Sequence, residues 1–351
     1  MRVAILGYGR VARALARLIA REQHVYPFRI VAAHTLRHGT AYDLHGLPQE
    51  PAFGPPAASA EEFLDRARAE ILVELTTMNP QDGEPATSHI RAAFARGMHV
   101  VTANKGPIAC RYAELAEEAR RAGVEFRFES SVMDGTPVFN LVRQCLPGVR
   151  VHGFAGVLNS TTQVILDCMR RGASLEEGID EARRLGVTEA DPWFDIDGWD
   201  SACKAAALAN VLMDARTTPT AVNRRGIGRL TPEKVAEAER SGKRIALVSR
   251  GRRTPQGVSL RVRAEVLPRT DLLAQFLARW ALSFWLVVAH ARRPGDPVLG
   301  QAIAEPPIAR LTGALARIII TGLDRCVCVC LALSGGRRCG RGRLLLGQAG
   351  G

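Results

Sequence analysis

The chain has 351 residues, of which 47% are hydrophobic and 23% are charged, so it is long enough for two cores, and both a disordered protein and a small disulfide-stapled scaffold are excluded. The formal net charge of +12 lies in the second part of the chain: residues 1–210 hold 23 basic and 26 acidic side chains, whereas residues 211–351 hold 24 and 9. Aromatic residues make up only 5%, and because nucleic-acid surfaces combine Lys and Arg with stacking aromatics, we do not expect nucleic-acid binding.

The sequence also weighs against a membrane protein. No apolar run reaches the roughly 18 residues that cross a bilayer, and the nearest, residues 281–291, contains Ser283 and His290. Met1 leads directly into a strand-like segment without the pattern of a signal peptide. We therefore expect a cytoplasmic protein that does not insert into a membrane.

The first 130 residues alternate strand-like apolar runs with helical patterns, which is typical of a doubly wound parallel sheet. Two of the expected helices are followed by a glycine, Gly97 or Gly123, as helix ends often are. The sequence predicts strands at 3–6, 28–33, 71–75 and 98–102, and helices at 11–20, 88–96 and 112–122.

After residue 124 the pattern changes to consecutive helices and isolated strands, which indicates a second, α+β unit. Ser174 is placed to cap a helix. The sequence predicts a strand at 151–157 and helices at 161–171, 175–185 and 200–213.

The first expected strand runs into Gly7-Tyr8-Gly9-Arg10-Val11-Ala12. A G-x-G-x-x-A run between a strand and a helix lets the backbone approach a pyrophosphate at the helix N-terminus. We therefore expect Gly7, Gly9 and Val11 to bind a dinucleotide. The alternative is an ordinary glycine turn.

The loop after the second expected strand indicates which dinucleotide binds. An acidic residue there would bind the ribose 2′-hydroxyl of NAD, but the first acidic residue after this strand is Asp43, beyond the loop. Arg37 lies in this loop, and a guanidinium suits the 2′-phosphate of NADP. The sequence thus favours NADP over NAD, unless Arg37 is a solvated loop residue.

Two further loops follow strands of the same expected sheet. Thr76 and Thr77 follow one strand, and Asn104 and Lys105 follow another. The carboxyl ends of parallel strands face the ligand crevice, so we expect these residues to contact the cofactor.

The densest group of charges spans residues 189–204, where five acidic residues precede one lysine. Asp200 and Lys204 are four residues apart and share one face of the expected helix. One interpretation is an acidic surface loop followed by a weak helical ion pair. Trp193 and Trp199 alternate with the acids and favour a pocket for a small zwitterion instead.

With these motifs in view, the chain resembles the homoserine dehydrogenases, which interconvert L-homoserine and L-aspartate 4-semialdehyde. The resemblance covers residues 1 to about 270 and rests on residues 182–204, with shorter matches at 74–80, 83–85, 101–107, 131–137 and 156–162. It implies an α/β fold, with a Rossmann-type dinucleotide-binding domain at 1–130 and an α+β substrate-binding and dimerisation domain at 131–270. It also implies a homodimer, an amino-acid substrate, and hydride transfer with NADP or NAD on the way to threonine and methionine.

The resemblance further implies roles for single residues. Lys204 would lie next to the reacting oxygen, with Asp200 one helical turn before it and Lys105 opposite, as a second cation that favours a neutral, proton-accepting lysine. Glu189 and Asp195 would hold the substrate ammonium. A monovalent cation would bind along the stretch that contains Glu129, Val132, Asp134 and Thr136.

Residues after about 275 depart from the family pattern. The family has a glycine-rich segment here through which the chain returns to the first domain, but this sequence has a Cys-rich run at 326–330 and an Arg- and Gly-rich run at 335–343 instead. A reading-frame change and genuine divergence both explain this departure. Under the first, segment 271–351 would pack poorly and leave the apolar residues 280–289 exposed. The competing interpretation of the whole chain is a catalytically inactive homologue that binds a nucleotide or a partner through its basic C-terminal third.

Overall fold

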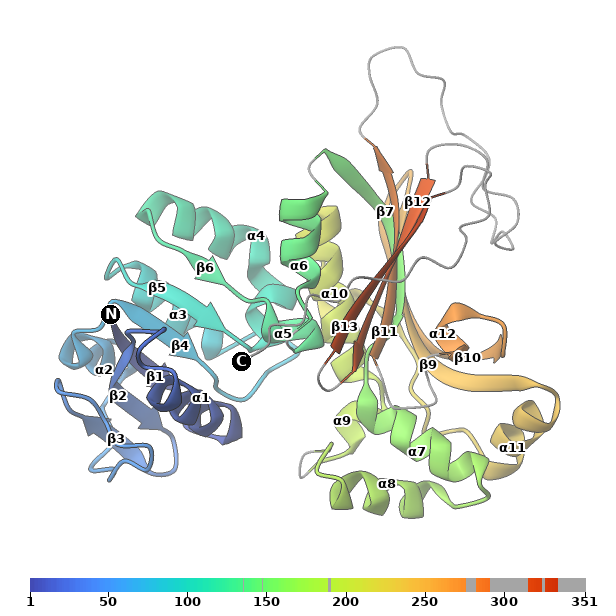
Figure 1. Cartoon of the computed structure of the whole chain (residues 1–351), viewed down its shortest axis with the longest axis horizontal. Helices are drawn as coiled ribbons and strands as arrows, with labels where there is room; N and C mark the ends of the chain where they lie inside the picture. Colours follow the sequence, from blue (N-terminus) through green and yellow to red (C-terminus); the bar gives the residue numbers. More distant parts are fainter. Residues whose placement is uncertain are drawn as a thin grey trace, which may run out of the picture.

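Two β-sheets, one on each side of helix α10 (Trp199–Met213), form the framework of the molecule (Figure 1). This computed structural model describes residues 1–134, 136–146, 148–188 and 191–275, and the backbone of three strands at 282–290, 315–323 and 326–333. None of the helices in these ranges is long and apolar enough to cross a membrane.

The N-terminal sheet has the strand order β3-β2-β1-β4-β5-β6. Its strands pair in parallel except β3, which runs antiparallel to β2. This arrangement confirms the doubly wound sheet expected from the sequence. The strands are β1 (Arg2–Leu6), β2 (Arg29–Thr35), β3 (Gly39–Tyr42), β4 (Ile71–Glu74), β5 (His99–Thr102) and β6 (Phe126–Arg127).

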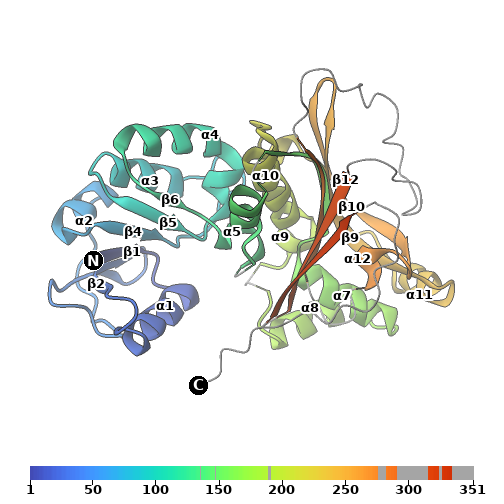
Figure 2. The ribbon, with the colours of Figure 1, turned by 45° about the horizontal axis from the view of Figure 1, so that its top comes forward.

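Helices cover both faces of this sheet, which is why its central strands are almost wholly apolar. In β1, Val3 and Ile5 share a hydrophobic cluster with Ala12 of α1 (Arg10–Arg21). Leu6 faces the opposite way and belongs to the cluster that contains Phe63. The helices on this second face are α2 (Ala60–Ala67), α3 (Ala86–Phe94) and α4 (Lys105–Ala122) (Figure 2).

The second sheet has the order β13-β12-β11-β7-β9-β10-β8 and is antiparallel except where β8 meets β10. In its strand β7, Phe154 belongs to the large hydrophobic cluster that includes residues of α10. Ala155 and Val157 belong to a separate cluster that includes Leu273 of α12. The strands are β7 (Val149–Val157), β8 (Asn223–Arg224), β9 (Lys243–Thr254), β10 (Gly257–Pro268), β11 (Leu282–His290), β12 (Leu315–Leu323) and β13 (Cys326–Leu333). The helices are α7 (Ser160–Arg170), α8 (Leu175–Arg184), α9 (Trp193–Ile196), α11 (Pro232–Arg240) and α12 (Leu272–Gln275), with a 3-10 turn η2 (Pro219–Ala221).

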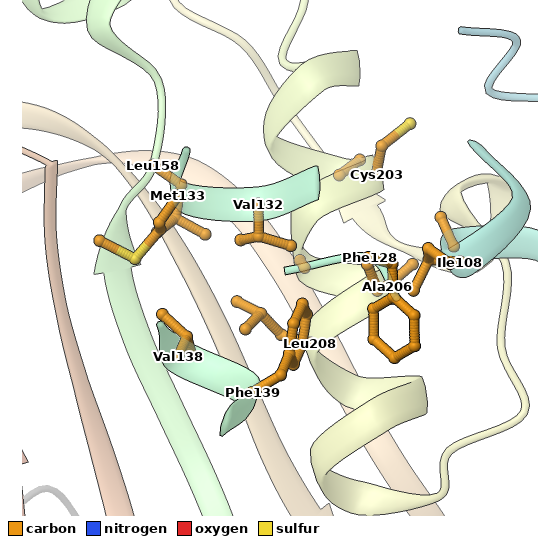
Figure 3. Close-up of a cluster of buried hydrophobic side chains, with 14 of the residues drawn as sticks. Ile108, Phe128, Val132, Met133, Val138, Phe139, Leu158, Cys203, Ala206 and Leu208 are labelled. Atoms are coloured by element: carbon orange, nitrogen blue, oxygen red, sulfur yellow. The ribbon is translucent and has the colours of Figure 1, made fainter. Parts of the chain in front are cut away.

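One continuous core joins the two sheets. Between them lie α5 (Ser130–Met133), α6 (Val138–Asn140) and a π-helical turn η1 (Leu141–Cys145). Ile108 of α4, Phe128, Phe139 of α6 and Leu208 of α10 all belong to this core (Figure 3). Five fully buried alanines on α10 leave room for close packing against α4, so helices from both halves of the chain meet at small side chains: Ala202, Ala205, Ala206, Ala207 and Ala209.

The predicted elements agree with the structure to within a few residues. The helix expected at 112–122 is the second part of α4, because Arg111 has a non-helical backbone (φ −138°) and separates it from a first part that begins at Lys105. The sequence did not predict this first part, which the Asn104 side chain caps by accepting a hydrogen bond from the Gly106 N–H. Ser174 caps α8 in a reciprocal capping box with Glu177, as the sequence predicted. Several further elements were not predicted from the sequence: α2, β3, β6, α5, α6, α9, β8, α11, α12, the long pair β9–β10, and β11 to β13.

The expectation for segment 271–351 remains a prediction. Beyond the backbone of α12 and of β11 to β13, most of this segment, and the side chains of 280–289 with it, lies outside the described residues.

Candidate active site

The turn between β1 and α1 has the backbone geometry that a pyrophosphate requires. Gly7 has a φ of +91°, and a Cβ at this position would lie 2.4 Å from the carbonyl oxygen of Leu75, so only glycine fits there. Gly9 is the N-cap of α1, and a Cβ there would meet nothing within 4 Å. Val11 is 59% exposed on the first helical turn. The turn therefore leaves open space beside the N-terminus of α1, where an anion is favoured.

The other residues predicted for the nucleotide lie at the same edge of the sheet. Thr76 and Thr77 follow β4, and Asn104 and Lys105 begin α4. The Asn104 side chain donates to the carbonyl oxygen of Thr76 at 3.1 Å, which joins these two loops directly. Arg37 is exposed in the turn between β2 and β3.

Glu74, which the sequence analysis did not single out, lies beneath both loops. Its side chain is fully buried at the end of β4. The carboxylate accepts hydrogen bonds from the Thr76 N–H at 3.0 Å and from the Thr102 hydroxyl at 3.0 Å, and the Thr76 hydroxyl donates to it as well. A carboxylate in an otherwise apolar strand was the signal available in the sequence, since such a group is buried only with partners.

Lys105, Asp200 and Lys204 come together where α4 meets α10. Lys105 Nζ lies 3.1 Å from Asp200 Oδ1, and Lys204 Nζ lies 2.9 Å from Asp200 Oδ2. Lys204 also donates to the carbonyl oxygen of Leu158 at 2.6 Å. The carboxylate of Asp200 is 8% exposed, so both ion pairs are largely shielded from solvent.

The charges in this cluster shift one another's titration. Burial alone would raise the pKa of Asp200, but the positive charges of Lys204 and Lys105 hold it well below its usual range. Burial would likewise lower the pKa of Lys105, yet the charge of Asp200 and its hydrogen bond raise it above the ordinary value. Lys105 was expected to act on Lys204 as a second cation, whereas the structure places the Asp200 carboxylate between the two ammonium groups.

Asp195 lies next to this cluster on α9. Asn159 Nδ2 donates to Asp195 Oδ1 at 2.6 Å and to Asp200 Oδ2 at 2.9 Å. Burial, and after it the charge of Asp200, raise the pKa of Asp195. Asn159 is a site residue that the sequence analysis missed, because its position before a helix predicts only an N-cap.

The aromatic residues of this segment contribute less to the site than the sequence suggested. The guanidinium of Arg224 covers the Trp199 ring at 3.8 Å. Trp193 is 51% exposed, and Ile196 is buried in the main core. Glu189, the other residue expected to hold an ammonium, lies outside the described residues.

The stretch expected to bind a monovalent cation does not form a set of side-chain ligands. The carboxylate of Glu129 accepts hydrogen bonds from the N–H groups of Phe139 and Asn140, at 2.8 and 3.0 Å. The Val132 and Thr136 side chains are buried, and Asp134 has a φ of +49°. A cation there would depend on main-chain carbonyl oxygens. Across the described ranges, no group of three or more His, Cys, Asp or Glu residues could hold a metal ion.

Comparison with known proteins assigns both halves of the chain. Residues 7–129 match the family model "Homoserine dehydrogenase, NAD binding domain", and residues 137–286 match "Homoserine dehydrogenase". The NAD(+)-dependent homoserine dehydrogenase of Pseudomonas canavaninivorans is 38% identical over 322 residues, which cover 86% of this chain and 92% of that protein. The homoserine dehydrogenase of Methanocaldococcus jannaschii is 35% identical over 269 residues, covering 71% and 80%.

The fold agrees with these sequence matches. A crystal structure of a homoserine dehydrogenase from Thiobacillus denitrificans superposes with a TM-score of 0.69 at 30% identity, over 83% of this chain and 66% of that one. The fold class expected from the sequence is therefore confirmed. With a glycine turn for a dinucleotide in one half, a lysine–carboxylate cluster at the junction, and family matches across both halves, this chain belongs to the homoserine dehydrogenase family.

Proposed function

We propose that this chain is an NAD(P)-dependent homoserine dehydrogenase, which interconverts L-homoserine and L-aspartate 4-semialdehyde. The observation that carries the proposal is the convergence of Lys105 and Lys204 on the Asp200 carboxylate, next to the loops at the carboxyl edge of the nucleotide sheet. An inactive, nucleotide-binding homologue would not need this costly arrangement of three largely buried charges. The enzyme is therefore the better interpretation.

The residues present fit a nicotinamide dinucleotide. Gly7 and Gly9 would hold the pyrophosphate at the start of α1, where Gly9 leaves open space, and Thr76, Thr77 and Asn104 would hold the nicotinamide end. When bound, the nicotinamide ring accepts or returns a hydride. Arg37 supports NADP as the preferred form, because a guanidinium pairs with a 2′-phosphate. The relative from Pseudomonas canavaninivorans is named as NAD(+)-dependent, so both forms are to be tested.

Lys204 is proposed to hold the reacting oxygen. An ammonium has three N–H donors, and Lys204 uses two of them on Asp200 and on the Leu158 carbonyl oxygen. The third is available for the substrate oxygen. In the reducing direction a protonated Lys204 stabilises the developing alkoxide and donates a proton to it, and in the oxidising direction a neutral Lys204 accepts the hydroxyl proton.

Lys105 and Asp200 are proposed to keep this lysine oriented. Asp200 binds both ammonium groups through different oxygens, so its carboxylate aligns the side chain from the nucleotide half with that from the other half. Asp195, together with Glu189, is proposed to receive the ammonium of the amino acid. A carboxylate in a partly desolvated pocket gains most from a cationic partner.

Two further expectations from the family stay proposals. A homodimer is expected, and gel filtration with light scattering would test it. A monovalent cation near residues 129–136 is given no step in the reaction, because the side chains there do not form a ligand set.

Cofactor absorbance with purified protein tests the proposed function. Reduction of NADP or NAD that depends on L-homoserine, and is much slower with L-serine, whose hydroxyl is one methylene closer to the α-carbon, is the expected result. Nucleotide binding without turnover of L-homoserine would favour the inactive homologue.

A further inference from the structure

Asn159 occupies a position in which both ends of its side-chain amide are engaged. The residue is 3% exposed and lies between the end of β7 and the start of α7. Its Oδ1 accepts a hydrogen bond from the Thr162 N–H at 2.8 Å, which caps the helix. Because Oδ1 faces this donor, the amide nitrogen must face the other way, toward Asp195 and Asp200.

The two N–H groups of the amide nitrogen donate to two different carboxylates. The nitrogen donates to Asp195 Oδ1 at 2.6 Å and to Asp200 Oδ2 at 2.9 Å. Asp200 is buried and Asp195 is half-buried, and two carboxylates this close repel each other unless donors separate them. Lys105 and Lys204 balance the charge of Asp200, whereas burial and the neighbouring charge of Asp200 raise the pKa of Asp195.

We propose that Asn159 is a positioning residue that separates the two carboxylates, so that Asp200 stays on the lysines while Asp195 is held ready for the ammonium of the amino acid. The inference rests on the proposed function of this site. The new element is that Asn159, which contacts the two carboxylates and the start of α7 and is not proposed to contact the substrate, controls the affinity for the amino acid.

A helix cap alone does not account for this residue. The caps of α2, α8 and α11 are the hydroxyl residues Ser59, Ser174 and Thr231, each accepting a bond from one backbone N–H. A hydroxyl or a carboxylate at position 159 would cap α7 equally well. Only an amide both accepts from the helix and donates twice to the acids.

The discriminating variant is Asn159→Asp, which keeps the shape and the capping oxygen but replaces the donor with a third acceptor. The charged groups that face it are Asp195 on α9, Asp200 and Lys204 on α10, and Lys105 on α4. At neutral pH we expect KM for L-homoserine to rise by roughly tenfold or more, because Asp195 is repelled from its place. KM for the nucleotide should stay within about twofold.

The pH profile separates positioning from a structural effect. As pH falls from 8 toward 6, the introduced carboxyl binds a proton and becomes a donor again, so we expect kcat/KM of N159D to recover relative to wild type. Its Tm should rise relative to wild type over the same range. Asn159→Ser keeps a capping oxygen but has no ionisable group, and should raise KM at every pH without recovery.

Ser174→Ala is the matched control, since it removes a helix cap far from the acids and should lower Tm while leaving KM and the pH profile unchanged. Wild-type KM and an unchanged pH profile in both Asn159 variants would overturn the positioning role. A wild-type protein without homoserine-dependent activity would instead overturn the proposed function and, with it, this inference.

Discussion

The ion pair between Lys105 and Asp200, 3.1 Å from Nζ to Oδ1, joins the first residue of α4 in the nucleotide half to α10 in the other half. In the proposed mechanism, this ion pair lies where charged side chains of both halves meet a substrate held between them. Stability and turnover should therefore depend on the same contact.

Asp200→Asn should lower both the thermal stability and the turnover of the protein. The substitution leaves two ammonium groups without their shared anion, and breaking such a buried pair costs about 3 kcal/mol or more. The folded-state pKa of Asp200 lies below its ordinary value, so its stabilising contribution is present above the ordinary pKa of about 3.9 and is lost as pH falls further. Thermal melts should show a large Tm deficit at pH 7 that narrows in strong acid. A variant with wild-type kcat and Tm at pH 7 would contradict the arrangement.

Gly9→Ala should separate folding from nucleotide binding. A Cβ at position 9 meets no atom within 4 Å, so Tm should change by no more than about 2 °C. The added methyl fills the space proposed for the pyrophosphate, and the Kd for NADP, measured by calorimetry, should rise roughly tenfold or more. Gly7→Ala should lose both stability and binding, because its Cβ would overlap the Leu75 carbonyl. Unchanged affinity in both variants would place the nucleotide elsewhere.

Arg37→Ala tests cofactor choice. Only NADP presents a 2′-phosphate to a guanidinium, so KM for NADP should rise about tenfold while KM for NAD changes by less than about threefold. Arg21→Ala is the control, since Arg21 is exposed and pairs with its neighbour Glu22. Equal effects on both cofactors would mean that Arg37 is a solvated residue.

The nucleotide half could be predicted from local patterns because each element there is marked by its own residues. The glycine turn, the apolar strands and the loops with Thr76 and Asn104 lie where the sequence predicted them. The strands β9 and β10 were missed because arginines interrupt them, among them Arg250, which pairs with Glu265 across the two strands. That pairing depends on register, which no single segment reveals.

The junction between the halves was predictable only in part. Asp200 and Lys204 are helical neighbours, so their contact follows from spacing. Lys105 and Asn159 belong to distant segments, and tertiary packing brings them to this cluster, because α4 and β7 both pack against the alanine-rich helix α10. The resemblance to a known family assigned Lys105 to this cluster, whereas nothing in the sequence assigned Asn159 to it.

Asp195→Asn should stabilise the protein while weakening substrate binding. Burial and the charge of Asp200 raise the pKa of Asp195, so its charged form costs stability above its ordinary pKa, and the cost disappears as pH falls below that value. At pH 7.5 we expect Tm to rise by roughly 1–3 °C and KM for L-homoserine to rise at the same time. Asp180→Asn, on an exposed helix face, should change neither quantity. A fall in Tm with unchanged KM would argue against this role.

The most direct test of the central claim is the turnover of Lys204→Ala with L-homoserine and NADP or NAD, measured beside the Kd of each nucleotide. Because Lys204 is proposed to hold the reacting oxygen and not the dinucleotide, kcat should fall by roughly a thousandfold or more, with nucleotide Kd within about threefold of wild type. A kcat comparable to that of wild type would contradict the account.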